Sequence, residues 1–229
     1  YKFSPIVKNA NSAYEAAAIL NNEIFEILGV EYSTKRPKAD QSPYESIDAG
    51  LASCTGLSFL LIDACRSVGI PARFVGTPMW YNDSGNHSWV EIWDGKWHFT
   101  GAAEPVEGEL NQVWFSDLAS KAKKGDMKYG IFAATWADTD LYFPMDWLPE
   151  IKKYNAIDVT DRYTIQHQKN QELVAVQIPM FSIVSCFRLA EWLAVWLLAG
   201  WLPAVWQWLG GLPVLFCWMQ LLRYGWNYI

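Results

Sequence analysis

The run from Cys54 to Val68 constrains the fold more than any other part of this sequence. Wound into a helix, it would place apolar side chains on nearly all sides, and Gly69 and Pro71 follow as a stop signal. A helix that is apolar all round must be buried by the rest of the chain. The sequence therefore predicts a central buried helix that begins at Cys54.

Cys54 itself lies at the start of this predicted helix, in Ala52-Ser53-Cys54-Thr55-Gly56. The N–H groups of a first helical turn and the helix dipole stabilise a thiolate, lowering its pKa from the free value of about 8.5. A cysteine at a helix start is by itself more often a small buried side chain. Its partners therefore decide whether it is a nucleophile.

Three segments after this helix have the composition of strands: 72–80, 88–93 and 96–100. Asp94-Gly95 joins the last two and is a strong hairpin signal, so we expect antiparallel pairing. A two-residue loop would set Trp93 opposite Lys96 and Glu91 near His98. The same count brings residues 101–104 alongside His87.

Other elements are expected on both sides of this region. We predict an amphipathic helix over residues 11–28 capped by Ser12, and a loop over residues 31–49 that leads to Cys54. Beyond the hairpin, we predict a helix over residues 116–124 capped by Ser116, then a strand and turn over residues 156–163.

A cysteine nucleophile needs a base, and a third group that orients the base. The histidines are His87, His98 and His167, and His87 begins a predicted strand just after the turn-forming segment 82–86. A strand start beside a loop is a typical edge of an active site. The register expected above places Glu104 near His87, where its carboxylate would accept the imidazole proton.

Residues 49–105 resemble the transglutaminase-like superfamily. The matching stretches are 52–56, the helix-to-strand link 64–73, and His87-Ser88-Trp89-Val90-Glu91-Ile92-Trp93-Asp94-Gly95-Lys96-Trp97. The resemblance implies an α+β fold, a papain-like transglutaminase core whose nucleophile-bearing helix packs on an antiparallel sheet. By position it makes Cys54 the nucleophile and His87 the base, and the upstream helix and proline loop fit a bacterial subgroup.

The third catalytic residue departs from the family pattern. The family usually has an Asp-Pro pair four residues after the tryptophan that matches Trp97, but Gly101 occupies this position. Glu104-Pro105 is the nearest acid–proline pair, so Glu104 is the expected orienting acid. Asn86 and Glu91 are the lesser candidates.

The resemblance implies acyl transfer through a thioester on Cys54, with peptide or carboxamide hydrolysis first and glutamine transamidation second. A binding module that has lost catalysis is the alternative from another class. We expect a substrate channel walled by Trp80, Tyr81 and Trp114, although large aromatic side chains near a core are more often structural.

Residues 1–177 are the predicted catalytic domain, and the composition changes in residues 178–229. Between Arg188 and Arg223 lie 34 residues whose only charged side chain is Glu191. Three interpretations compete for this tail: a membrane anchor through residues 189–222, a non-native end such as a shifted reading frame, and a buried core element. The chain has no initiator Met or signal sequence, so we expect a removed leader or a start within a longer protein.

The formal net charge of −6 and the lack of a basic stripe argue against nucleic-acid binding. The cysteines at 54, 65, 186 and 217 form no CxxC pair, so neither a zinc site nor a disulfide scaffold is expected. No cofactor is implied, and calcium-loop spacing is absent from the sequence. The expected partner is a protein or peptide substrate, in the cell envelope or secreted rather than in the cytoplasm.

Overall fold

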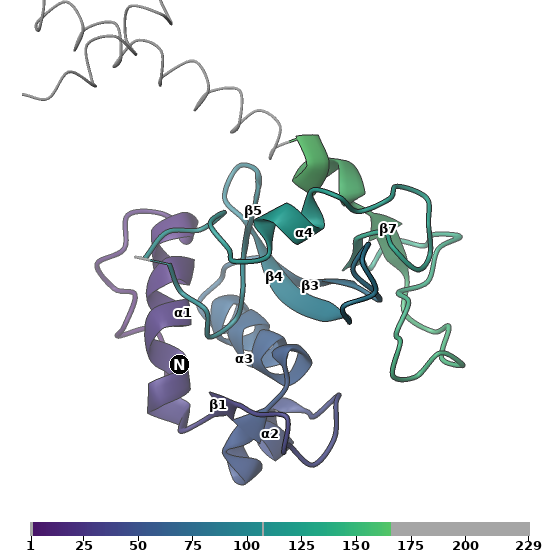
Figure 1. The fold of residues 1–229 in the computed structure, drawn as a ribbon. Helices are drawn as coiled ribbons and strands as arrows, with labels where there is room; N and C mark the ends of the chain where they lie inside the picture. Colours follow the sequence, from purple (N-terminus) through teal and green to yellow (C-terminus); the bar gives the residue numbers. More distant parts are fainter. Residues whose placement is uncertain (1, 107, 166–229) are drawn as a thin grey trace, which may run out of the picture. The chain divides into compact units, whose positions relative to one another are not determined.

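The computed structural model describes residues 2–106 and 108–165. The amino-terminal part holds α1 (Ala13–Leu28), β1 (Glu31–Tyr32), α2 (Pro43–Ala49), β2 (Leu51–Ala52) and α3 (Cys54–Ser67). Short strands β1 and β2 pair in parallel just before α3 (Figure 1). This pairing fixes where the chain enters α3.

An antiparallel sheet of five strands follows, with the spatial order β5-β4-β3-β6-β7. Its strands are β3 (Ala72–Thr77), β4 (His87–Trp93), β5 (Trp97–Thr100), β6 (Phe132–Ala134) and β7 (Ala156–Asp158). The short helix α4 (Ser116–Ala119) lies between β5 and β6 in the sequence. The predicted α+β fold, with the cysteine-bearing helix packed on an antiparallel sheet, is confirmed.

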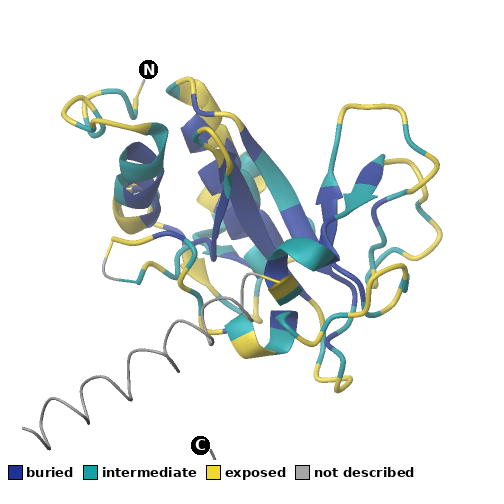
Figure 2. Ribbon diagram, turned by 90° about the horizontal axis from the view of Figure 1, so that it is seen from above, coloured by how far each residue is buried: buried dark blue, intermediate teal, exposed yellow. Residues whose placement is uncertain are grey.

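Both faces of the sheet are buried, because side chains of β4 alternate between two cores. Val90 and Ile92 pack with α1 and α3, whereas Trp89 packs with Phe115 near α4. Figure 2 shows buried residues along the sheet and on the helices beside it. The predicted central helix is thus confirmed as α3, covered by α1 on one side and by the sheet on the other.

The prediction of a loop over residues 31–49 was wrong for its second half, which forms α2. Ser42 caps this helix, since its side chain accepts a hydrogen bond from the Glu45 N–H while the Glu45 carboxylate accepts one from the Ser42 N–H. Pro43 occupies the first helical turn, where a missing N–H costs nothing. The proline that suggested a loop is in fact part of a helix start.

The hairpin exists, but its register differs by one residue from the prediction. Trp93 pairs with Trp97, so that Glu91 lies opposite Phe99 rather than His98. The loop contains three residues, with Gly95 at a φ of 71° and the Asp94 N–H bonded to the Lys96 carbonyl at 2.9 Å. Two further predictions were only partly right. α4 ends at Ala119 and its N-cap is Phe115, so the predicted cap at Ser116 was wrong. Residues 160–165 are helical.

The predicted membrane anchor and its alternatives fall on residues 178–229, which lie outside the described residues. Among residues 2–106 and 108–165, no helix combines the length and the apolar character that a membrane span requires.

Candidate active site

Cys54 is the first residue of α3, and local hydrogen bonds fix this position. The Ser53 side chain caps the helix by accepting a hydrogen bond from the Gly56 N–H at 3.3 Å, and donates one to the Ala39 carbonyl at 2.6 Å. A side chain at Gly56 would press on α2, since an added Cβ would lie 3.0 Å from the Ser46 Oγ. The cap and the close helix packing therefore hold the thiol at the first turn.

His87 is the first residue of β4, where it pairs with Thr77 of β3. Its ring is 7% exposed and packs at centroid distances of 4.7 Å from Phe115, 5.9 Å from Trp89 and 6.0 Å from Trp80. The imidazole is thus held by an aromatic cluster on the sheet face opposite α3.

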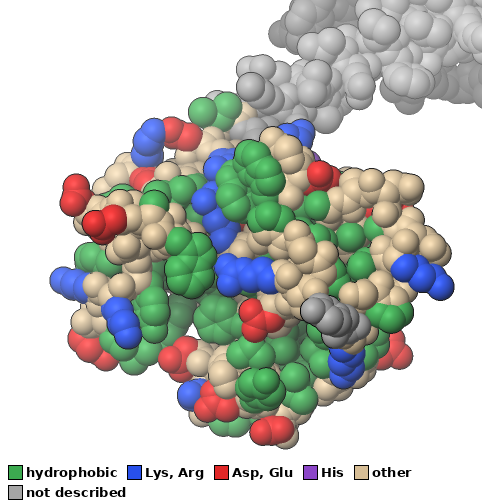
Figure 3. Space-filling view, turned by 180° about the vertical axis from the view of Figure 1, so that it is seen from behind, with side chains coloured by type: hydrophobic (Ala, Val, Ile, Leu, Met, Phe, Trp, Pro, Cys, Tyr) green, Lys and Arg blue, Asp and Glu red, His purple; other side chains and the backbone are tan. Residues whose placement is uncertain are grey.

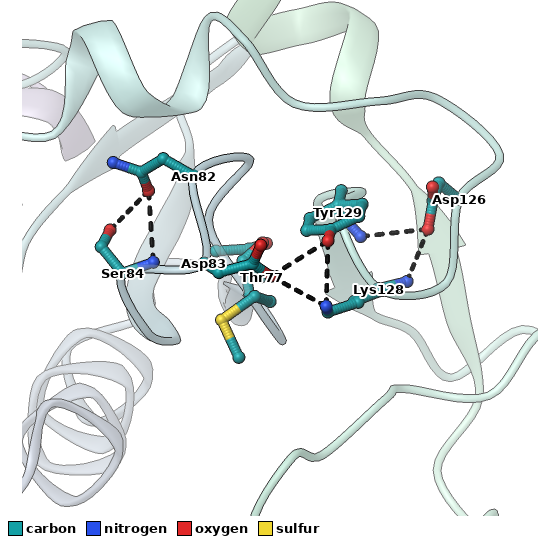
Figure 4. Close-up of polar contacts among 8 residues, drawn as sticks. Thr77, Asn82, Asp83, Ser84, Asp126, Lys128 and Tyr129 are labelled. Carbon is teal, nitrogen blue, oxygen red and sulfur yellow. Dashed lines mark hydrogen bonds and ion pairs between the residues drawn. The ribbon is translucent and has the colours of Figure 1, made fainter.

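The loop that precedes His87 is anchored to a turn far along the sequence (Figure 4). The Asp83 carboxylate accepts hydrogen bonds from the Lys128 ammonium at 2.8 Å and from the Tyr129 hydroxyl at 3.0 Å. Asp126 in turn accepts hydrogen bonds from the backbone N–H groups of Lys128 and Tyr129. These contacts give the start of β4 a second attachment besides its pairing with β3.

The Cys54 thiol and the His87 imidazole lie close enough for each to shift the pKa of the other. Burial by itself would raise the pKa of Cys54, but His87 and the backbone N–H groups of Ser88 and Thr55 lower it below its usual value. Burial would likewise lower the pKa of His87, but its contacts with Cys54 and Glu104 raise it to about 9. Both shifts favour the thiolate–imidazolium form of the pair over the neutral form.

Glu104, the expected orienting acid, also lies near the imidazole. Its Oε2 is 3.8 Å from the His87 Nε2, an ion-pair contact that is longer than a hydrogen bond. Such distances commonly shorten when substrate binds.

Two neighbours define where the Glu104 carboxylate lies. The Trp114 indole N–H donates a hydrogen bond to the Glu104 Oε2 at 2.9 Å. A Cβ added to Gly101 would overlap the same oxygen, so the carboxylate occupies the space that a side chain at this position would fill. Gly101 is where the family resemblance places the acid, and Glu104 reaches this space from three residues further on.

The lesser candidates for the acid lie elsewhere. Glu91 is fully buried and bonds to Arg73, Arg162 and Tyr163, which makes it the centre of a structural ion-pair network. Asn86 is exposed, and within the described residues no hydrogen bond joins its side chain to His87. Neither residue has the contact with His87 that Glu104 has.

The three aromatic residues expected to wall a channel have different environments. Trp80 is 3% exposed and stacks on Trp89, so its prediction as a channel wall was wrong: it belongs to the core behind His87. Tyr81 is partly exposed, and its hydroxyl accepts a hydrogen bond from Lys121. Trp114 is 61% exposed with its ring 5.2 Å from that of His87, so it borders the site.

Several contributors to the site were missed from sequence. The Ser88 backbone N–H faces the thiol because β4 passes the start of α3, where Thr55 and Ser88 hydroxyls lie 3.3 Å apart. The bond from Trp114 to Glu104 joins two loops. Neither contact has a local sequence signal, since each depends on how distant segments meet.

Two cavities open elsewhere on the surface. One of about 530 Å³ is lined by Arg66, Arg73 and Lys153 together with Trp97 and Trp136. Another, of about 470 Å³, is lined in part by His98 and Arg162. Figure 3 shows the back face of the molecule, where Lys and Arg side chains lie between hydrophobic ones with Asp and Glu around them. Neither cavity includes Cys54 or His87, so the candidate active site is defined by its thiol–imidazole contact.

A helix-start thiol beside a buried imidazole is an arrangement that suits cysteine-based chemistry. Residues 3–101 match the family model described as the transglutaminase-like superfamily. The match ends before Glu104.

Among solved structures, the chain is similar to one described as a "putative cysteine protease from Cytophaga hutchinsonii". The identity is 22% and the TM-score 0.39, and the match covers 48% of this chain but only 38% of that chain. No curated protein matches this sequence.

Proposed function

We propose that this protein hydrolyses peptide or carboxamide bonds through a thioester on Cys54. The observation that carries the proposal is a thiol at a helix start beside a buried imidazole, which also contacts the carboxylate of Glu104. The match of residues 3–101 to the transglutaminase-like superfamily supports cysteine-based chemistry. Glu104, near the imidazole, is the proposed orienting acid.

In the first step, the Cys54 thiolate attacks the carbonyl carbon of the substrate, and the carbonyl oxygen takes the negative charge. The backbone N–H of Cys54, the first residue of α3, is the proposed donor to this oxyanion. The imidazolium of His87 then gives its proton to the leaving nitrogen as the C–N bond breaks. The products of this step are ammonia or an amine and a thioester on Cys54.

In the second step, neutral His87 takes a proton from water, and the hydroxide attacks the thioester carbon. The C–S bond breaks, the carboxylic acid leaves, and Cys54 returns as a thiolate beside imidazolium. Glu104 stabilises the positive charge on His87 in both steps without taking the proton itself. Atoms and charges balance over the cycle, with one water consumed.

Solvent exposure supports water over an amine as the acceptor. Cys54 is partly exposed, and Trp114 beside the site is 61% exposed. An open site lets water reach the thioester, whereas a site that excludes water favours amine transfer.

The test compares wild type with Cys54→Ala on a panel of peptide amides, with and without an added primary amine. Hydrolysis predicts release of ammonia or amine that the added amine does not divert, and no turnover by Cys54→Ala. Cys65→Ala is the matched control, because Cys65 is fully buried in the core and its loss should leave turnover intact. Incorporation of the added amine would instead support transamidation, and absence of turnover with every substrate would support a binding module.

A further inference from the structure

Asn21 is a buried polar side chain that the steps above do not use. It lies on α1, among apolar neighbours such as Leu20 and Ile24, and is only 2% exposed. A polar amide in this environment is costly unless its hydrogen bonds are made. The residues to which Asn21 bonds therefore show which segment of the chain its side chain stabilises.

All partners of Asn21 lie in one short segment, which runs from the last residue of β5 to Ala103. Its Nδ2 donates hydrogen bonds to the Thr100 Oγ1 at 3.0 Å and to the Gly101 carbonyl at 2.9 Å. Its Oδ1 accepts one from the Ala103 N–H at 2.9 Å. One side chain thus bonds to three of the four residues that precede Glu104.

This segment has an unfavourable backbone conformation. The Glu104 N–H bonds to the Gly101 carbonyl at 3.3 Å, which closes a β-turn from Gly101 to Glu104. Ala103 has a φ of 62°, a value at which a residue with a Cβ is strained. Such a conformation persists only where surrounding contacts impose it, and the bond from the Ala103 N–H to Asn21 is such a contact.

The turn sends the Glu104 side chain back over Gly101, towards His87. Absence of a side chain at Gly101 leaves the space that the carboxylate fills, and the Trp114 N–H holds it there. The short reach of a glutamate makes its distance from His87 depend on the turn.

We propose that Asn21 is a positioning residue, which holds the Gly101–Glu104 turn so that the Glu104 carboxylate meets His87. This inference rests on the proposed function, since it assigns Asn21 a role through the acid of that site. Asn21 does not touch the reacting atoms. It acts from another helix, through the backbone conformation of Ala103 and the position of Glu104.

The experiment measures the rate at which iodoacetamide alkylates Cys54 in the full chain at pH 6, with peptide mapping to separate it from the other cysteines. Glu104→Gln should slow this rate about tenfold, because loss of the carboxylate weakens the imidazolium that stabilises the thiolate. Asn21→Leu and Asn21→Ala should slow it to a similar extent. Gly101→Ala should also slow the alkylation of Cys54, since the added Cβ displaces the Glu104 carboxylate. This variant leaves α1 and Asn21 unchanged.

Two comparisons separate positioning from general damage to the fold. Tyr14→Phe is the matched control, because it also removes hydrogen bonds from α1 to a loop, at Glu109 and Leu110, and should leave the alkylation rate unchanged. Asn21→Leu should slow alkylation no further in a Glu104→Gln background. Circular dichroism at the assay temperature confirms that each variant is folded.

The outcomes are distinguishable. If Glu104→Gln slows alkylation and the folded Asn21 variants do not, the role of Asn21 is overturned while the proposed acid stands. Additional slowing by Asn21→Leu in the Glu104→Gln background would also overturn it, because the effect would not pass through Glu104. An unchanged rate in Glu104→Gln would overturn both the acid and its positioning residue.

Discussion

The Glu104 carboxylate reaches to within 3.8 Å of the His87 Nε2 although it leaves the backbone four residues after the end of β5. A strand-end residue would face His87 directly, but Gly101 has no side chain to offer. The carboxylate of Glu104 instead folds back into the space over Gly101. The position of this carboxylate in space is thus not the one that its place in the sequence would suggest.

This contact predicts how the pH dependence of activity changes in Glu104→Gln. The carboxylate helps to raise the pKa of His87 from 6.5 to about 9, so its loss should lower that pKa. The basic limb of kcat/KM, where the imidazolium loses its proton, should therefore move to lower pH in the variant. We expect kcat/KM itself to fall about 10²-fold, which is typical of a misplaced catalytic group.

The raised pKa of His87 also makes the stability of the folded protein depend on pH. Because the pKa of His87 is about 9 in the folded protein and 6.5 ordinarily, the stabilisation due to its proton is complete below pH 6.5. It is lost as the pH rises through 9.

A rescue variant checks whether the Glu104 carboxylate occupies the space that a side chain at Gly101 would fill. Gly101→Asp combined with Glu104→Ala should recover part of the activity, and no recovery would contradict this shared position.

Selective alkylation is the second prediction. The pKa of Cys54 is lowered by His87 and by backbone N–H groups, whereas burial raises the pKa of Cys65 to about 12. Iodoacetamide below pH 7 should therefore label Cys54 rapidly and leave Cys65 unmodified in the folded protein. Labelling of Cys54 at the rate of a free thiol would contradict the thiolate–imidazolium pair, and His87→Ala should reduce the rate to that level.

The sequence was sufficient to predict the elements that bring the site together. The apolar run after Cys54 predicted α3, and Asp94-Gly95 predicted the hairpin that carries His87 towards Glu104. The register was wrong by one residue because the loop holds three residues, a choice set by the conformation of Gly95. The prediction that residues 101–104 lie alongside His87 was little affected, since a shift of one pair moves residues by only a few ångströms.

What the sequence did not predict depends on contacts between distant segments. Burial of Trp80 results from stacking on Trp89 of β4, and nothing local distinguishes it from the exposed Trp114. Asn21 is separated from its partners by about 80 residues of sequence, as the interval to Thr100 shows. In contrast, α2 did have a local signal, the capping box of Ser42 and Glu45, which Pro43 masked.

The third prediction concerns the buried ion-pair network around Glu91. Its carboxylate bonds to Arg73 at 2.7 Å and also to Arg162 and Tyr163, which ties residues 160–165 to the sheet. Glu91→Gln leaves both arginines without their counter-charge, so we expect a loss of about 3 kcal/mol in the free energy of unfolding. Urea unfolding followed by fluorescence measures it.

An exposed pair provides the comparison for Glu91. Lys124 and Asp161 form an ion pair whose side chains are 63% and 50% exposed. Removing one partner of such a pair typically costs less than about 1 kcal/mol. Equal losses in Asp161→Asn and Glu91→Gln would show that burial does not make the Glu91 network special.

The fourth prediction separates the stability of a helix from the reactivity of the residue at its start. Ser42 and Ser53 cap α2 and α3 respectively, and in each case the hydroxyl accepts a hydrogen bond from a backbone N–H three residues on. Replacing either serine with alanine should cost about 1 kcal/mol of unfolding free energy. Only Ser53→Ala should also slow the alkylation of Cys54, because the lost cap and the lost bond to the Ala39 carbonyl loosen the turn that presents the thiol to His87. Thermal unfolding and alkylation measured on both variants check this difference, and equal alkylation rates would mean that β1–β2 pairing alone fixes the position of Cys54.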